Sequence, residues 1–187
     1  MLFLADNVGN IVSTSSISKG LVANGREKST TPATRTVDNY LDALTKSFII
    51  YGIKRYDIKG KQFLKTLGKY YLVDLGFRSM LLGYRNIDRG HILENVVYLE
   101  LLRRGYRVSI GKTGEKEVDF IAETPSDRIY IQVTEFMLGE STRQRELAPL
   151  YAINDFYQRL VLSMDREFVD SYDGIKVMNI IDWLLQE

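Results

Sequence analysis

The sequence contains no cysteine among its 187 residues, and it has only one histidine, one tryptophan and three prolines. The lack of cysteine excludes a disulfide scaffold, a thiol nucleophile and a cysteine-ligated zinc site. The single histidine, His91, excludes a histidine-rich metal site. No apolar run approaches the roughly 20 residues of a membrane-spanning helix, and residues 1–6 lack the features of a signal peptide. We therefore expect a soluble, cytoplasmic protein with no membrane partner.

The charged residues are distributed unevenly along an otherwise ordinary globular composition. The chain is 45% hydrophobic and 26% charged, which excludes disordered, collagen-like and low-complexity classes. Residues 1–89 carry 14 Lys and Arg against 7 Asp and Glu, a net charge of +7; residues 90–187 carry 11 against 17, a net charge of −6. This split predicts two modules with different electrostatic partners. We place them at residues 1–83 and 84–187.

The N-terminal half shows three helical segments followed by strands. We expect helices ending near residue 10, over 14–22 and from 32 or 33 onward, and strands at 48–56, 58–64 and 69–73. The third helix has apolar residues at i, i+3, i+4 and i+7, which predicts one buried face of Val37, Tyr40, Leu41 and Leu44. Three helices, a strand, a basic turn at Gly60-Lys61 and a strand follow the order of a winged helix-turn-helix. Another small α+β module is the alternative.

The C-terminal half opens with a helix over 90–104 that is apolar on almost every side, so we expect it to be buried. Strands are predicted at 106–110, 117–122 and 128–136, then a helix at 142–152. Strands at 160–164 and 175–178 and a closing helix at 180–185 complete the pattern. Helix, three strands, helix, two strands is the order of an α/β sandwich. The whole chain is therefore predicted to be α+β.

Two of the predicted strands carry polar residues on one face. Because strand residues alternate between faces, Glu117 and Asp119 should share one face, and Val118 and Phe120 the other. If the strands pair, Asp119, Gln132 and Thr134 line one polar patch. Glu94 should lie within reach on the preceding helix, where a lone buried carboxylate needs a partner. The residues that open the next helix, Thr142, Arg143, Arg145 and Glu146, are candidates to donate to this patch or to a phosphate; a solvated first turn is the alternative.

This layout of acidic and polar residues resembles the PD-(D/E)XK nuclease fold. The resemblance implies carboxylates that hold a divalent metal for water activation, and a lysine that positions the nucleophile. Here Gln132 stands at the Glu position and Thr134 at the Lys position. We therefore expect a vestigial site without assigned catalytic residues, in which Glu94 and Asp119 hold Mg²⁺ weakly. The alternatives are a metal-dependent nuclease that uses Lys112 or Lys116, and ordinary surface polarity.

A second resemblance covers nearly the whole chain. It rests on residues 69–77 (KYYLVDLGF), 90–106 (GHILENVVYLELLRRGY), 116–121 (KEVDFI), 130–133 (YIQV), 140–146 (ESTRQRE) and 173–175 (DGI). These segments are similar to a C-terminal domain of unknown function that follows an AAA+-like ATPase domain in many bacterial and archaeal proteins. The resemblance implies an ATPase domain, a winged helix and a nuclease-like domain, in that order. ATP would bind only in the ATPase domain. Residues 111–113 (GKT) do not form a phosphate-binding loop, because five residues separate them from the preceding Gly105 where the motif has four, and a strand is expected after them. We expect no other cofactor in this chain.

The basic residues of the predicted wing form the second candidate site. A basic β-wing neutralises phosphates while the third helix reads base edges, although Asp38 and Asp42 on that helix would repel DNA. The candidate DNA-binding residues are Arg35, Asn39, Lys54, Arg55, Lys59 and Lys61. The alternative is a basic hairpin that packs on the acidic half or on a partner protein. We therefore predict a non-catalytic regulatory or DNA-binding region of an AAA+-type ATPase. A further alternative is a protein-interaction module that docks on the ATPase domain or on a second copy in a homo-oligomer.

Overall fold

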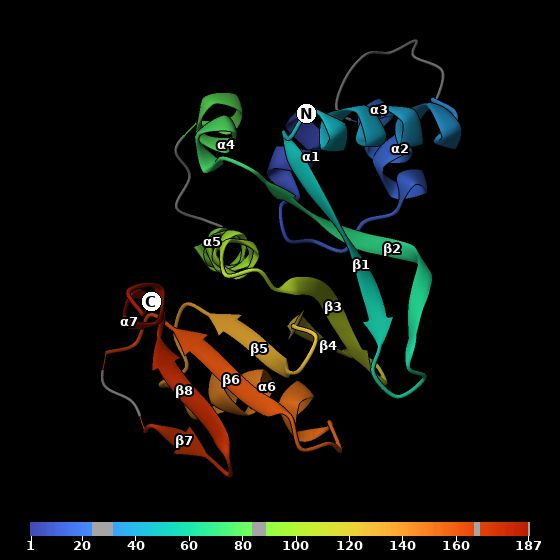
Figure 1. Cartoon of the computed structure of the whole chain (residues 1–187). Coiled ribbons are helices and arrows are strands. Elements are labelled where there is room, and N and C mark those ends of the chain that lie inside the picture. The colour runs from blue at the N-terminus through green and yellow to red at the C-terminus, as the bar shows by residue number, and fades with distance from the viewer. Residues whose placement is uncertain (24–31, 84–88, 167–168, 187) are drawn as a thin grey trace. The chain divides into compact units, whose positions relative to one another are not determined.

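The computed structural model describes residues 1–23, 32–83, 89–166 and 169–186 (Figure 1). It shows a mixed α/β protein with one large mixed sheet, which confirms the predicted combination of helices and strands. The chain forms two compact units, Met1–Lys54 with Lys65–Asp88, and Arg55–Leu64 with Arg89–Glu187. None of the helices in the described residues has both the length and the apolar character needed to cross a membrane.

The first unit contains four helices and the stem of a β-hairpin. These elements are α1 (Leu2–Asp6), α2 (Thr14–Ala23), α3 (Thr34–Lys46), α4 (Leu75–Leu82), β1 (Ile50–Asp57) and β2 (Gln62–Leu72). Helix α1 packs on α4, and α2 packs on α3. Helix α3 buries Val37 and Leu41, but Tyr40, which we predicted on the same face, is 68% exposed. A single neighbouring helix covers only a narrow stripe of α3, so the predicted buried face was too wide.

A short backbone bridge joins the segment between α1 and α2 to the hairpin. Val12 and Gly68 form an antiparallel pair whose two N–H···O distances are 2.9 and 3.1 Å. A side chain at position 68 would place its Cβ 2.5 Å from the Ile53 carbonyl oxygen, so only glycine fits between these strands. The first unit therefore runs helix, bridge, two helices and a hairpin whose second strand carries the bridge.

Two features of the first unit differ from the sequence-based predictions. Strand β2 is continuous from Gln62 to Leu72, whereas we predicted separate strands at 58–64 and 69–73. Helix α4, which we did not predict, follows it. The Asp74 carboxylate caps this helix by accepting the Gly76 N–H at 2.6 Å. An aspartate directly before an apolar segment is a usual helix-start signal, and it was available in the sequence.

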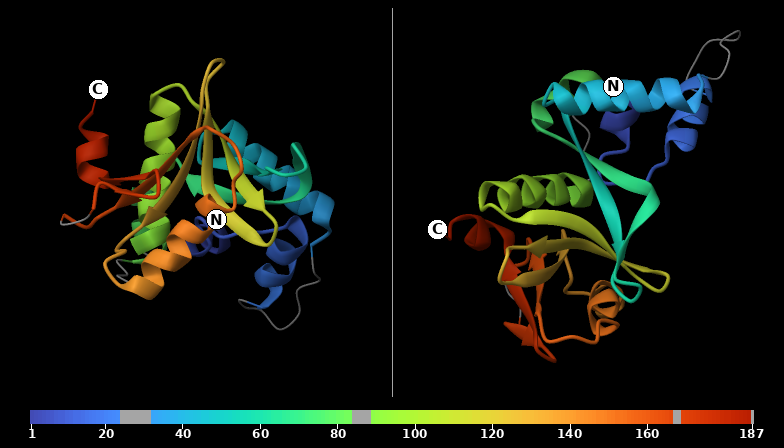
Figure 2. Two further views of the ribbon diagram at one scale, coloured as in Figure 1. Left: turned by 90° about the horizontal axis from the view of Figure 1, so that it is seen from below. Right: turned by 45° about the vertical axis from the view of Figure 1, so that its right-hand side comes forward.

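The second unit is built on a sheet with helices on both faces. Its elements are the hairpin tip, α5 (Arg89–Arg103), β3 (Arg107–Thr113), β4 (Lys116–Glu123), β5 (Arg128–Thr134), α6 (Glu140–Tyr151), β6 (Gln158–Ser163), β7 (Ser171–Tyr172), β8 (Ile175–Asn179) and α7 (Ile180–Leu184). The strand order is β2-β1-β3-β4-β5-β6-β8-β7. Strands β3, β4 and β5 form an antiparallel meander, and β6 and β8 continue it in parallel (Figure 2).

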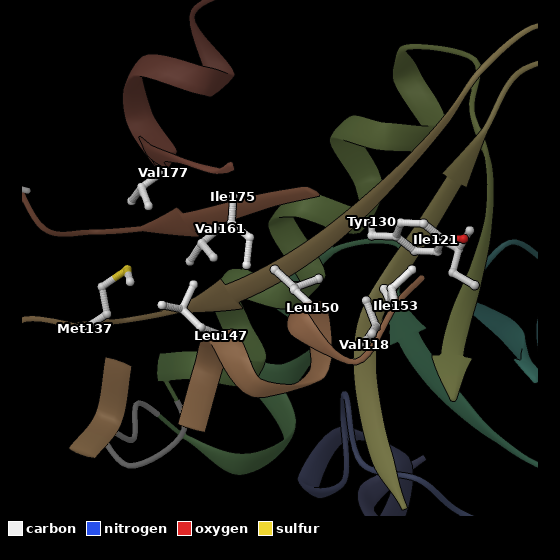
Figure 3. Packing of buried hydrophobic residues seen from close by; sticks show 10 residues of the cluster. All are labelled: Val118, Ile121, Tyr130, Met137, Leu147, Leu150, Ile153, Val161, Ile175 and Val177. Atoms are coloured by element: carbon white, nitrogen blue, oxygen red, sulfur yellow. The ribbon is translucent and has the colours of Figure 1, made fainter. Parts of the chain in front are cut away.

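One face of this sheet packs against α6 through a continuous apolar cluster (Figure 3). The cluster consists of Val118, Ile121, Tyr130, Met137, Leu147, Leu150, Ile153, Val161, Ile175 and Val177. On the opposite face, Phe120 of β4 stacks on Tyr98 of α5 with ring centroids 6.1 Å apart. The near-continuous burial of β4 and β5 follows from this double cover, since a sheet covered on both faces needs apolar residues at successive positions.

A β-bulge in β4 changes which residues share a face. Ser109 pairs with Ile121 and Gly111 pairs with Val118, so Asp119 and Phe120 together stand opposite the single residue Ile110. The prediction that Val118 and Phe120 share a face is wrong, because the extra residue reverses the alternation at that point. Val118 packs in the cluster under α6, whereas Phe120 packs on α5.

Arg104 holds α7, the C-terminal helix of the second unit, in place through several contacts. Its guanidinium donates to the Trp183 and Gln186 carbonyl oxygens at 2.7 and 2.9 Å, and lies 4.4 Å from the centroid of the Trp183 ring. It also pairs with Glu100 at 2.6 Å. A helix as short as α7 depends on such tertiary contacts, because isolated short helices are unstable in water.

We expect Arg104→Ala to lower the unfolding free energy of the second unit by about 2–4 kcal/mol, the value of charged hydrogen bonds plus a cation–π contact. Urea unfolding followed by the fluorescence of Trp183, the only tryptophan, measures it. Arg103→Ala is the matched control, because Arg103 pairs with the same Glu100 but its side chain is 64% exposed. The Arg103→Ala variant should lose much less unfolding free energy. Equal losses in the two variants would contradict the assignment.

Candidate functional site

Two buried polar side chains meet where the pairing of β4 with β5 ends. Asp119 and Gln132 are 6% and 8% exposed, and the last paired residues before them are Phe120 and Ile131. Beyond that pair, hydrogen bonds from side chains replace the backbone hydrogen bonds between the two strands. The Asp119 carboxylate accepts the Val133 N–H at 2.8 Å, and the Gln132 carbonyl oxygen accepts the Asp119 N–H at 3.4 Å. The structure thus brings these two predicted residues together as a cross-link between diverging strands.

Helix α6 adds a carboxylate and a cation to this pair. The Gln132 amide donates to Glu146 Oε2 at 3.2 Å, and the Arg145 guanidinium donates to Glu146 Oε1 at 2.8 and 3.1 Å. Glu146 is buried, whereas the Arg145 side chain is 74% exposed. We call the series Asp119, Gln132, Glu146 and Arg145 the polar network. The sequence named Glu146 only as one of several helix-start residues, because its distance along the chain hides its contact with Gln132.

The other two residues of the predicted patch have different surroundings. The Thr134 hydroxyl donates to the Phe136 carbonyl oxygen at 3.1 Å, so it stabilises the turn that follows β5. Glu94 is buried on α5, which packs against β3, β4 and β5. Within the described residues, no group of three or more His, Asp or Glu is arranged to hold a metal ion. The metal role of Glu94 and Asp119 stays a prediction.

The two lysines considered as replacements lie on neighbouring strands. Lys116 directs its amine to the Ala148 carbonyl oxygen of α6 at 3.3 Å. Lys112 pairs in the sheet with Glu117 on one side and with Asp57 of the hairpin tip on the other. The cation of the polar network is instead Arg145, which pairs with Glu146.

The basic hairpin tip is an integral part of the second unit. Residues 55–57 pair in parallel with residues 110–112 of β3, and the Ile58 N–H donates to the Lys112 carbonyl oxygen at 2.9 Å. Tyr56 and Ile58 pack against the apolar cluster. The tip therefore packs on the acidic half of the chain, as one of our alternatives states. Lys54, Lys59 and Lys61 are exposed, and Arg55 is half-buried.

The turn of the hairpin exposes two lysines. The Asp57 carboxylate accepts the Lys59 and Gly60 N–H groups at 3.1 Å each, so this acid is used to hold the turn. Lys61 adopts a left-handed backbone with φ of 51°. In the described part of the chain, neither Lys59 nor Lys61 has a side-chain partner.

Helix α3 exposes both the predicted DNA-contacting residues and two acids. Arg35, Asn39, Asp38 and Asp42 all face solvent. Asp42 is neutralised by Lys46, whose amine lies 2.6 Å from the carboxylate. Burial and the nearby Asp38 carboxylate raise the pKa of the Tyr70 hydroxyl. One of the two acids expected to repel DNA on α3 is therefore paired with a lysine.

A cluster of aromatic rings around Arg128 was not predicted from the sequence. The Arg128 guanidinium carbon lies 5.5, 6.0 and 5.4 Å from the ring centroids of Tyr56, Tyr130 and Tyr157. Its N–H groups donate to Glu123 at 2.5 and 2.9 Å. Burial and a 2.6 Å hydrogen bond to Asp155 raise the pKa of Tyr130 to about 12. The three tyrosines come from β1, β5 and the segment after α6, so no local pattern joins them.

Comparisons with known proteins place the chain among uncharacterized relatives. Residues 1–88 match the model of a domain of unknown function (DUF8612). An uncharacterized protein of Haemophilus influenzae is 41% identical over 186 residues, which is 100% of this chain and 45% of that protein. An uncharacterized protein of Methanocaldococcus jannaschii is 30% identical over 126 residues, 65% of this chain and 27% of that protein. The chain thus spans less than half the length of these relatives.

Proposed function

We propose that this chain is a DNA-binding region without catalytic activity, and that it regulates a longer protein. The observation that carries the absence of catalysis is the polar network. A hydrolytic magnesium needs free carboxylate oxygens, and the attacking water needs a nearby cation. Here Asp119 accepts a backbone N–H, Glu146 accepts from Gln132 and Arg145, and Thr134 holds its own loop. These groups stabilise the fold in the positions where a nuclease would use them for chemistry.

The arrangement of the first unit supports the DNA-binding part of the proposal. A helix, a bridge, two helices and a hairpin whose second strand carries the bridge follow the order of a winged helix. The bridge between Val12 and Gly68 supplies the short first strand that this order needs. In the hairpin tip, which belongs to the second unit, Lys59 and Lys61 have no acidic partner among the described residues, and such cations bind phosphates independently of sequence.

The resemblance to the region behind an AAA+-like ATPase domain supports the proposed context. The relatives are more than twice as long as the stretch that this chain matches in them. We propose that the remaining length of such a protein carries the ATPase, which would be the only site for ATP. Binding of DNA by this region would then be coupled to nucleotide hydrolysis elsewhere in the protein.

Charge reversal at the hairpin tests the proposal. We expect Lys59→Glu with Lys61→Glu to weaken binding of duplex DNA tenfold or more, by a similar factor for unrelated sequences. The slope of log affinity against log salt should flatten by about two, since each phosphate contact contributes about 0.9. Fluorescence anisotropy at several salt concentrations measures both. Arg166→Glu with Lys176→Glu is the control, because both residues are exposed and the charge change is the same. Unchanged affinity in the hairpin variant would assign the hairpin to a protein partner instead.

One observation favours protein docking as a second candidate function. Leu2 of α1 and Met80 of α4 are large, exposed apolar residues on two helices that pack together. Exposed apolar side chains of this kind mark protein contacts when they gather in a patch. If docking is the function, Leu2→Ser with Met80→Ser should abolish binding to the remaining part of the longer protein and leave DNA affinity unchanged. Analytical ultracentrifugation of the mixture measures the complex.

A further inference from the structure

Exposed aromatic rings surround the Arg128 cluster of the second unit. Phe63 on β2, and Phe156 and Tyr157 after α6, are exposed, and Phe156 is fully so. We propose that Phe63, Phe156 and Tyr157, together with Lys59 and Lys61, form a surface that stacks the unpaired bases of single-stranded DNA. We call these five residues the aromatic surface. The inference rests on the proposed function, because it names the form of DNA that the second unit binds.

Ring contacts connect the two ends of this surface. Phe63 meets Tyr56 edge to face with centroids 5.2 Å apart, and Arg128 lies 5.5 Å from Tyr56 and 5.4 Å from Tyr157. All of these residues belong to the second unit. Tyr56 and Arg128 thus link Phe63 at the hairpin tip to Tyr157 in the segment that follows α6.

Hydrogen bonds hold the segment that carries Phe156 and Tyr157. Asp155 accepts the Tyr130 hydroxyl at 2.6 Å and the Tyr157 N–H at 3.2 Å, and its carbonyl oxygen accepts from Arg159 at 3.1 Å. The segment is therefore tied to β5 and β6 while its rings stay in solvent. A backbone segment held in place loses little conformational entropy on binding, which favours a stacking role.

Two lysine amines of this surface can bind the phosphates of a polyanion. Glu123 is paired with Arg128, Asp155 accepts hydrogen bonds from Tyr130 and Tyr157, and Asp57 holds the hairpin turn. Lys59 and Lys61 are the groups of this surface that lack a side-chain partner among the described residues. The amines of Lys59 and Lys61 are therefore available to bind a phosphate backbone.

Base stacking explains why the ligand is a single strand. An aromatic side chain stacks on the face of any base, whereas duplex DNA hides these faces within its own stack. The combination of a basic strip with successive aromatic residues is the usual chemistry of single-strand binding without sequence preference. An apolar protein partner would instead desolvate the two lysines that flank the rings, at a cost that nothing on the surface offsets.

The test measures the binding of a fluorescein-labelled 15-nucleotide thymidine strand and of a labelled duplex by anisotropy at low and moderate salt. We expect Phe156→Ala with Tyr157→Ala to reduce affinity for the single strand at least tenfold, with duplex affinity changed less than twofold. Phe136→Ala with Leu138→Ala, at exposed sites of the same unit, should leave both unchanged. Tyr157→Phe keeps the ring and should retain affinity. Phe156→Ala alone removes a fully exposed side chain, so its loss of binding cannot come from unfolding.

The outcomes separate this inference from the proposed function. If the wild-type chain binds the duplex but not the single strand, the inference is wrong and the proposed function stands. If it binds neither, both are wrong. An equal loss of single-strand affinity in the Phe136 and Leu138 variant would also overturn the inference, as would full single-strand affinity in Phe156→Ala with Tyr157→Ala.

Discussion

Gln132→Glu should destabilise the second unit by about 3–5 kcal/mol at neutral pH, the cost of a buried charge without a partner. In the wild-type chain, the Gln132 amide donates to Glu146 Oε2 at 3.2 Å. The substitution removes that donor and places a second carboxylate against a buried one. Both carboxylates cannot remain ionised at that distance without a large penalty. The change that makes the sequence look more like a nuclease is therefore the one that the fold tolerates least.

The destabilisation should depend on pH in a defined direction. Repulsion raises the pKa of one carboxyl of the pair in the folded variant above the value of about 4.3 that glutamate has in an unfolded chain. A raised folded-state pKa means that folding is favoured where the group is protonated. Stability should therefore recover as pH falls toward 4, and be lost again as pH rises through the folded-state value.

Urea unfolding of the variant and the wild type at pH 7 and pH 4.5 measures this difference. Gln132→Leu is the control, because it removes the same donor without adding charge and leaves Glu146 paired with Arg145. The loss of unfolding free energy in Gln132→Leu should be smaller than in Gln132→Glu, and it should not depend on pH between 4.5 and 7. A Gln132→Glu variant as stable as the wild type at pH 7 would show that the polar network is not as described.

Manganese supplies a further arm of that experiment. Three carboxylates, at Asp119, Glu146 and the substituted position 132, form the kind of oxygen cluster that hard divalent cations prefer. Manganese should restore part of the lost stability of Gln132→Glu and leave the wild type unchanged. Stabilisation of the wild type by manganese would favour the nuclease alternative.

The second large effect is an absence of DNA cleavage. Plasmid and linear DNA incubated with the chain in magnesium, and then in manganese, should remain as intact as in buffer. The loss of one electrostatic donor from such a site typically costs a hundred- to a thousand-fold in rate. Here Thr134 offers no charge, and the carboxylates of the polar network already accept hydrogen bonds from the protein.

Asp119→Ala is the control for that assay. Metal-dependent cleavage by the wild type that disappears in this variant would contradict the proposal, and would promote the nuclease alternative. Lys112→Ala and Lys116→Ala would then identify which lysine takes part. Cleavage that persists in Asp119→Ala would instead indicate a contaminating nuclease.

The features that follow from local pattern could be predicted from the sequence. The long helix at 90–104 and the strands at 106–110, 117–122 and 128–136 match α5, β3, β4 and β5 closely. Each of these segments carries closely spaced apolar residues and ends before a glycine or a turn. The mixed α/β class follows from the order of such segments alone.

The features that depend on contacts between distant residues could not be predicted. The bulge at Asp119 and Phe120 is a property of the β3–β4 pair, and it overrides simple alternation. Glu146 reaches Gln132 only because α6 packs on β4 and β5. The tyrosines around Arg128 come from three separate elements. Residue types in a single sequence carry no record of these distances.

The most direct test of the central claim is one titration of labelled duplex DNA with this chain in magnesium, repeated at 50 and 200 mM salt. Anisotropy reports binding, and a gel of the same samples reports cleavage. We expect affinity to fall steeply with salt, as phosphate contacts require, and all of the DNA to be recovered intact. Binding that is absent at both salt concentrations, or DNA that is cut by the wild type but not by Asp119→Ala, would contradict it.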